Sequence, residues 1–111
     1  MALDLPTLRK LVALDEKDAL SRFALGRKLV ESASGDDAPE LAEAADHLIF
    51  ANRHSPDHLA TYRILGEALI RLNRKDGARE VLKEGIRRVA AVGEGMGRDL
   101  GPVMQRMLDG L

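Results

Sequence analysis

The chain has 111 residues, 45% of them hydrophobic and 32% charged, and its formal net charge at pH 7 is −1. This length favours one domain, and with one Tyr, two Phe and no Trp the core must be aliphatic, which is typical of helical proteins. The absence of Cys excludes disulfides and thiolate chemistry, and the near-neutral charge argues against a nucleic-acid partner. The first 14 residues include Asp4, Arg9 and Lys10 and no continuous apolar stretch, so we expect no signal peptide, no membrane span and a cytoplasmic location.

The N-terminal segment, residues 1–17, is expected to contain a short leading helix. Residues 6–14 place Leu8, Leu11 and Val12 on one helical face, which predicts that this face packs against the helix that follows.

Residues 18–56 are expected to form two helices with a long connection. Apolar residues recur at helical spacing from 18 to 32, and Asp18 is the expected cap of that helix. A loop rich in Ser, Gly and Asp follows. The next helix is expected to be capped by Asp37, to have Pro39 in its first turn and to end near Arg53.

Residues 57–92 are expected to form two more helices. The first has Ser55 as its expected cap and Pro56 in its first turn, and it extends to about Leu72. After a polar turn at 73–75, the second continues until the glycines at 93, 95 and 97.

The last segment, residues 93–111, combines a glycine-rich link with an amphipathic helix that Asp99 is expected to cap. Its apolar stripe predicts a capping helix packed on the helix before it. The alternative is a helix that swings out to bind a partner or a second protomer. The stripe consists of Leu100, Val103, Met104, Met107, Leu108 and Leu111.

An internal duplication relates the two middle segments, because the dipeptides Leu25-Gly26 and Leu65-Gly66 stand 40 residues apart in similar surroundings. At the crossing of two helices a glycine removes the side chain that would hold their axes apart, so Gly26 and Gly66 predict close contact within each helix pair. The first unit has six extra residues, which fall within its loop, where added length costs little.

This pattern resembles the tetratricopeptide repeat, a pair of helices of about 34 residues with the signature W-x2-L-G-x2-Y, A-x3-F and P. Arg22 stands where the family has a large aromatic residue, and Ala90 stands where the second unit would end in Pro. Ala51 and Gly85 occupy equivalent small positions. The first unit matches through Leu25, Gly26, Leu29, Ala44, Leu48 and Pro56, and the second through Tyr62, Leu65, Gly66, Leu69, Ala78 and Leu82.

The resemblance implies an all-α fold, a short α-solenoid of two helix-turn-helix repeats with capping helices at both ends. It also implies a non-enzymatic adaptor that binds a peptide from a partner protein in a groove lined by the first helix of each repeat. Phe23 is expected to serve recognition more than packing, and the peptide is expected to lie between Phe23 and Ile70. The groove residues are Phe23, Arg27, Val30, Arg63, Glu67, Ile70 and Arg71.

Two other functions stay open. Residues 1–56 contain 7 basic and 10 acidic residues and residues 57–111 contain 10 and 8, so the halves carry −3 and +2. Such an asymmetry suits a self-associating protein, a homodimer without a separate ligand. A weaker alternative is the regulation of a nucleic-acid process, because residues 63–88 carry a net charge of +4.

Signals for chemistry are weak, so we expect no catalytic residue, cofactor or metal. The glycines at 93, 95 and 97 follow a helix instead of a strand and lack the Lys and Ser or Thr of a nucleotide site. His54 and His58 have the spacing of a helical metal pair, but Pro56 lies between them. His47 has no nucleophile placed beside it by any motif.

Overall fold

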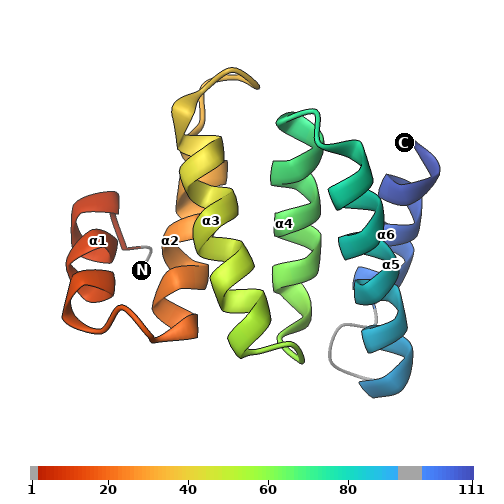
Figure 1. Cartoon of the computed structure of the whole chain (residues 1–111), viewed down its shortest axis with the longest axis horizontal. Coiled ribbons are helices and arrows are strands. Elements are labelled where there is room, and N and C mark those ends of the chain that lie inside the picture. The colour runs from red at the N-terminus through yellow and green to blue at the C-terminus, as the bar shows by residue number, and fades with distance from the viewer. Residues whose placement is uncertain (1–2, 93–98) are drawn as a thin grey trace.

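The computed structural model describes residues 3–92 and 99–111, and the regular structure in these residues is entirely helical (Figure 1). The expectation of an all-α fold is therefore confirmed. Among the described helices, none combines the length and the apolar character needed to cross a bilayer. The helices are α1 (Leu5–Leu14), α2 (Ala19–Ser32), α3 (Pro39–His54), α4 (Leu59–Arg71), α5 (Lys75–Val92) and α6 (Leu100–Asp109).

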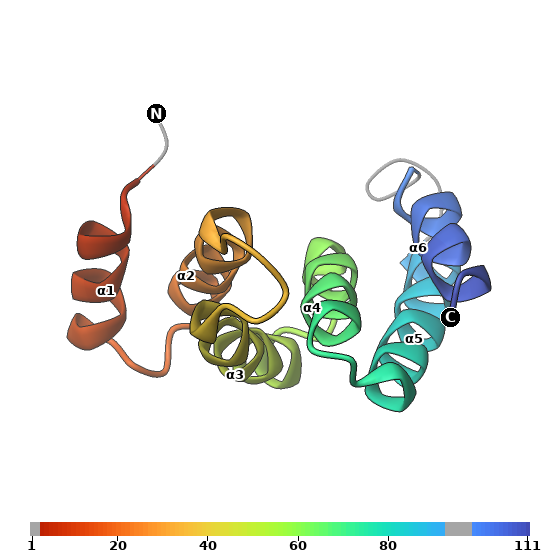
Figure 2. The same cartoon turned by 90° about the horizontal axis from the view of Figure 1, so that it is seen from above.

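Successive helices run in opposite directions, so α1, α3 and α5 point one way and α2, α4 and α6 the other (Figure 1). Each helix packs against the next one in the chain, and in addition α2 touches α4 and α4 touches α6. Viewed from above, α2, α4 and α6 lie toward one side and α3 and α5 toward the other (Figure 2). Helix α1 and the α5–α6 pair therefore lie at opposite ends of a molecule whose longest extent is 35 Å.

The start of α2 agrees with its predicted cap. The Asp18 carboxylate accepts hydrogen bonds from the Leu20 amide at 3.3 Å and from the Ser21 hydroxyl. The Ser21 hydrogen bond is the main cause of a lowered pKa of Asp18, so the cap stays ionised and favourably placed at the positive end of the helix dipole.

The predicted cap of α3 is wrong by one residue. The cap position is Ala38, which has no side-chain hydrogen bond to offer, and Pro39 is the first helical residue. Asp37 lies instead in a turn that is closed by a hydrogen bond from the Ala38 amide to the Gly35 carbonyl at 3.1 Å. Because proline lacks an N–H and has a fixed φ, it suits the first helical position and sets where the helix begins.

The predicted cap of α4 is also wrong, because Ser55 ends α3 and α4 begins only at Leu59. Pro56 occupies the second position of a turn closed by a hydrogen bond from the His58 amide to the Ser55 carbonyl at 3.1 Å. The Tyr62 hydroxyl donates a hydrogen bond to the Pro56 carbonyl at 2.6 Å. Proline thus belongs to the turn here, and a buried tyrosine one turn into α4 holds it.

The predicted polar turn after α4 is confirmed at residues 72–74, one residue earlier than expected because Lys75 already belongs to α5, and its backbone explains the sharp reversal. Asn73 has φ 60°, the left-handed conformation that asparagine tolerates better than most residues. The Arg74 amide donates to the Leu69 carbonyl at 2.8 Å and the Asn73 amide to Ile70 at 2.9 Å. This pair of hydrogen bonds is a Schellman motif, which satisfies the last carbonyls of the helix.

The predicted glycine contacts are confirmed in both helix pairs. A Cβ at Gly26 would lie 2.7 Å from Leu48 Cγ, and a Cβ at Gly66 would lie 2.7 Å from Leu82 Cδ2. Each leucine side chain therefore occupies the space that a side chain on the facing helix would need. The α2–α3 and α4–α5 pairs are held together by the same contact.

The C-terminal helix packs on α5, as the capping interpretation predicts. Met104 of α6 is fully buried and forms a second core cluster with Tyr62 and Leu82. A third glycine makes this possible, because a Cβ at Gly85 would lie 2.6 Å from Tyr62 Cβ and 2.7 Å from Met104 Sδ. Asp99 occupies the cap position of α6 as expected, but its side chain makes no cap hydrogen bond.

The N-terminal helix buries a narrower face than predicted. Leu8 and Val12 are buried in the main core cluster, whereas Leu11 is 38% exposed and Leu14 is 83% exposed. Asp4 caps the helix by accepting a hydrogen bond from the Thr7 amide at 3.0 Å. Because the backbone of α1 packs closely only on α2, one helical face is what it buries.

Candidate protein-interaction site

The apolar residues predicted for the groove on α2 are part of the core. Phe23 is 8% exposed, and its ring meets the His58 ring edge-on with 4.5 Å between centroids. Val30 is 4% exposed. Phe23 therefore packs within the fold, because its ring fills the space where α2 meets the start of α4. Its expected role in recognition stays a prediction.

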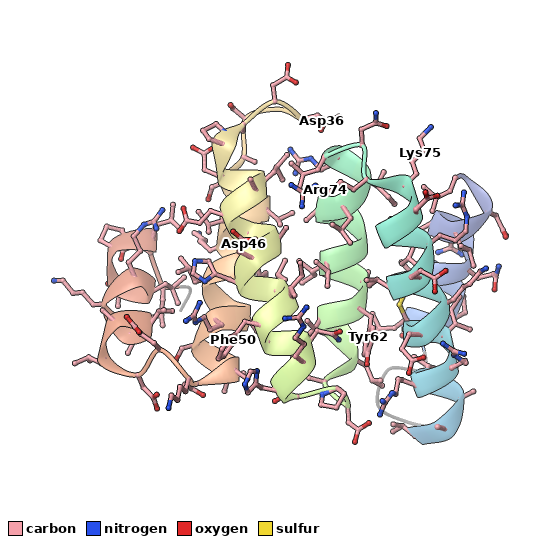
Figure 3. All side chains as sticks on the ribbon, viewed as in Figure 1. Asp36, Asp46, Phe50, Tyr62, Arg74 and Lys75 are labelled. Carbon is pink, nitrogen blue, oxygen red and sulfur yellow. The ribbon has the colours of Figure 1, made fainter. Side chains whose placement is uncertain are left out.

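Arg71, the last predicted groove residue, ties α4 to the chain that follows α2. Its guanidinium donates to the Val30 carbonyl at 3.1 Å and to the Ala33 carbonyl at 3.5 Å, and its Nε lies 2.9 Å from Asp36 Oδ1. Asp36 lies on the loop between α2 and α3, which contains the predicted extra residues (Figure 3). The side chain is only 22% exposed, so Arg71 is committed to contacts within the fold.

The remaining polar groove residues are accessible. Arg27 pairs with Glu31 at 2.9 Å on α2, and both side chains are more than half exposed. Arg63 lies 3.7 Å from Glu67 on α4, with side chains 34% and 40% exposed. Ion pairs this exposed hold their partners weakly, so these arginines stay available to a carboxylate from another molecule.

Ile70 completes the predicted set, and it is half-buried between the two core clusters. Of the seven residues, the structure therefore leaves Arg27, Arg63 and Glu67 as accessible groups. It places Phe23, Val30 and Arg71 in internal contacts.

A hollow of about 340 Å³ lies between the N-terminal segment, α1 and α2. Leu20 and Leu3, which are 64% and 47% exposed, lie at its surface. Phe23 and Arg27 of the predicted groove line this hollow. The accessible apolar surface therefore lies between α2 and α1, and not between α2 and α4 as the predicted groove required. The lining residues are Leu3, Leu8, Leu20, Phe23, Ala24, Arg27, Lys28 and Glu31.

The rim of this hollow is charged, with two cations and one anion among its lining residues. Near it, the hydrogen bonds from Thr7 are the main cause of a lowered pKa of Asp4, and the charge of Lys28 adds to the shift. The exposed Leu20 was visible in the sequence as an apolar residue early in the helix. Leu3 and Lys28 were missed, because nothing in the pattern shows how the N-terminal segment folds back beside α2.

A network of charged and aromatic side chains joins α1, α2 and α3 on another surface. Arg9 of α1 bonds to both carboxylate oxygens of Glu43, and His47 Nε2 lies 3.2 Å from Glu43 Oε2. The hydrogen bond from Arg9 is the main cause of a lowered pKa of Glu43. His47 Nδ1 lies 3.4 Å from Arg22 Nη1, so both ring nitrogens have a partner and the network holds three helices together.

Arg22 departs from the aromatic residue of the repeat signature, and its contacts explain how it fits. Its guanidinium lies over the Phe50 ring, 4.4 Å from the centroid, and its Nε donates to the Glu16 carbonyl at 2.9 Å. Phe50, which Figure 3 labels on α3, stacks on His54 with 4.1 Å between centroids. A cation on an aromatic face thus replaces an aromatic contact at this crossing.

The histidines considered as a metal pair have partners within the protein. His54 Nδ1 lies 3.0 Å from the Phe50 carbonyl oxygen, and His58 Nδ1 lies 2.8 Å from Thr61 Oγ1. Over residues 3–92 and 99–111, no three acidic, histidine or cysteine side chains are grouped so that they could hold a metal ion. The glycine run at 93–97 lies outside the described residues.

Comparison of the chain with models of protein families, with curated proteins and with solved structures finds no match. The resemblance to the tetratricopeptide repeat therefore depends on the residues of this chain and on the contacts that they make.

Proposed function

We propose that this chain is a protein-interaction module built from two tetratricopeptide-like repeats. The support is that equivalent positions of the two helix pairs are buried to the same extent and pack in the same way. Leu25 and Leu65 are each 1% exposed, and in both pairs a Cβ on the glycine would lie 2.7 Å from the facing leucine. Ala44 and Ala78 are each 0% exposed. Arrays of such pairs offer the faces of their first helices to partners.

The single observation that carries the binding proposal is the hollow beside α2. Leu20, a large apolar side chain that is 64% exposed, lines this hollow together with the buried Phe23. Arg27 also lines the hollow and supplies a positive charge. An apolar hollow with a few polar groups at its edge is the usual form of a recognition site. The ligand that fits is a peptide with a large apolar side chain next to a carboxylate, which continues toward Arg63 and Glu67 on α4.

The test is selection of binders from a random peptide library displayed on phage, followed by fluorescence anisotropy with the selected peptides. We expect the peptides to combine a large apolar residue with an acidic one. Leu20→Glu is expected to weaken binding at least tenfold, because a carboxylate would face the apolar floor, and Arg27→Glu is expected to weaken it by charge reversal.

The matched control is Leu14→Glu, which places the same new charge at an exposed leucine of α1 that does not line the hollow. It is expected to bind the selected peptides like the unmodified chain. If the library yields no binder, or if Leu20→Glu and Leu14→Glu bind equally well, the proposed site is wrong.

A further inference from the structure

A second hollow, of about 390 Å³, lies along the seam between α5 and α6, at the end of the molecule opposite α1 (Figure 1). Ile86 and Leu108 supply its apolar surface and are half-buried against the second core cluster. Around them stand Glu80 and Lys83, both exposed, and Arg87, whose side chain is 73% exposed. The seam therefore offers an apolar strip with an anion at one end and two cations farther along α5.

The opposite end of the molecule carries the complementary features. Leu14 is the most exposed large hydrophobic residue in the part of the chain that the structure describes, at 83%. Lys10 lies one turn before it on the same side of α1, and Asp15 and Glu16 follow it directly, all of them exposed. The order is therefore a cation and an apolar residue on α1, followed by two anions just beyond its C-terminal end.

The direction and spacing of these groups match in one orientation. Helix α1 runs parallel to α3 and α5 within the chain, so a second copy shifted along the row brings its α1 beside α5 in parallel (Figure 1). At 1.5 Å per residue, Lys10 and Leu14 are about 6 Å apart along α1, and Glu80 and Arg87 are about 10.5 Å apart along α5. Helix α1 ends at Leu14, so Asp15 and Glu16 lie just beyond it, in the turn before α2. In this parallel register Lys10 meets Glu80, and Glu16 meets Arg87.

Between these two ion pairs, Leu14 reaches the apolar strip formed by Ile86 and Leu108. The antiparallel register is disfavoured, because it would place Lys10 against Arg87.

We propose that the chain associates with itself head to tail, with α1 of one copy in the seam between α5 and α6 of the next. This contact joins two different surfaces, so each added copy leaves one free surface at either end of the assembly. Growth therefore continues past the dimer as the concentration rises. Peptide binding beside α2 uses other residues and does not depend on this contact.

The test is sedimentation equilibrium of the full chain up to about 1 mM, a range that detects weak association. We expect the weight-average mass to rise past that of a dimer. Leu14→Glu blocks one surface and the double variant Lys83→Glu, Arg87→Glu blocks the other, so each alone is expected to stay monomeric. Their equimolar mixture retains one working pair of surfaces and is expected to reach a dimer and stop.

Charge reversal tests the register. Lys10→Glu and Glu80→Lys are each expected to weaken association by roughly two- to fivefold, the usual effect of an exposed ion pair, and a chain that carries both is expected to recover. Leu20→Glu is the control, because it changes an exposed leucine outside the seam and leaves association unaltered. Circular dichroism checks folding, which substitutions at these exposed positions preserve.

Several outcomes would overturn the proposal. A monomer at every concentration removes the contact altogether, and an assembly that stops at the dimer requires a symmetric interface instead. A mixture of the two blocked variants that stays monomeric, or charge reversals whose losses simply add, shows that α1 and the seam are not partners. Peptide binding is measured separately, so these results do not test the proposed function, which depends on the peptide-binding experiment alone.

Discussion

Gly85 is the position where a single methyl group is expected to disturb the most structure. It lies on α5 where α4 and α6 both approach, and a Cβ there would be 2.6 Å from Tyr62 Cβ and 2.7 Å from Met104 Sδ. The methionine sulfur belongs to a flexible side chain and can shift. The Tyr62 Cβ is attached directly to the backbone of α4, so relief at that contact requires the helices to separate.

Two effects of Gly85→Ala oppose each other. Alanine in place of glycine inside a helix contributes about 1 kcal/mol of stability, because the unfolded chain loses freedom. Overpacking a core typically costs about 1–3 kcal/mol, and a contact with a backbone-fixed carbon belongs near the upper end. The net expectation is a loss of about 1–2 kcal/mol, which lowers the melting temperature by roughly 4–8 °C in a domain of this size.

Gly77 provides the control on the same helix. A Cβ there would lie 3.7 Å from Leu69 Cδ1, an ordinary contact, so Gly77→Ala is expected to stabilise the protein by up to about 1 kcal/mol. Thermal and urea unfolding followed by circular dichroism measure both variants. If Gly85→Ala is as stable as Gly77→Ala, the close approach of α4 and α5 at this point is wrong.

Three further predictions test other contacts. Gly66→Leu is expected to lower the thermal midpoint far more than Glu67→Leu, because Leu82 fills the space beside the glycine; equal effects would count against the helix crossing. Arg71→Gln is expected to cost about 1–3 kcal/mol in urea unfolding by removing the charged hydrogen bonds to the part-buried Val30 and Ala33 carbonyls, and an unchanged midpoint would show that the tie to the loop adds nothing. The hydrogen bond from Arg9 lowers the pKa of Glu43 below its ordinary value of 4.5. The ionised Glu43 therefore contributes its full stability at a pH above 4.5, and this stability is lost as the pH falls through the lower pKa of the folded state. Urea midpoints measured from pH 6 to pH 3 are expected to fall less steeply for Glu43→Gln, and parallel curves would contradict this.

Much of the helical architecture could be predicted because it depends on local chemistry. Apolar spacing located the helices, and the paired glycines identified the two crossings at which Leu48 and Leu82 now lie. The cap at Asp18 followed from a short side chain beside free amides. The caps assigned to Asp37 and Ser55 were wrong because both prolines were expected in the first turn of a helix. Pro39 does begin α3, but Pro56 lies in the turn before α4.

The candidate site was less predictable, because it depends on which elements come together. The sequence by itself determined the all-helical fold, the small residues at helix crossings and the charges available on α2 and α4, since these follow from residue type and spacing. Only the tertiary structure decided that Phe23 packs on His58, that Arg71 binds carbonyls beyond the end of α2, and that Leu20 stands over an apolar hollow. Contacts between residues far apart in the chain depend on the angles and distances between helices, and helical periodicity carries no information about those.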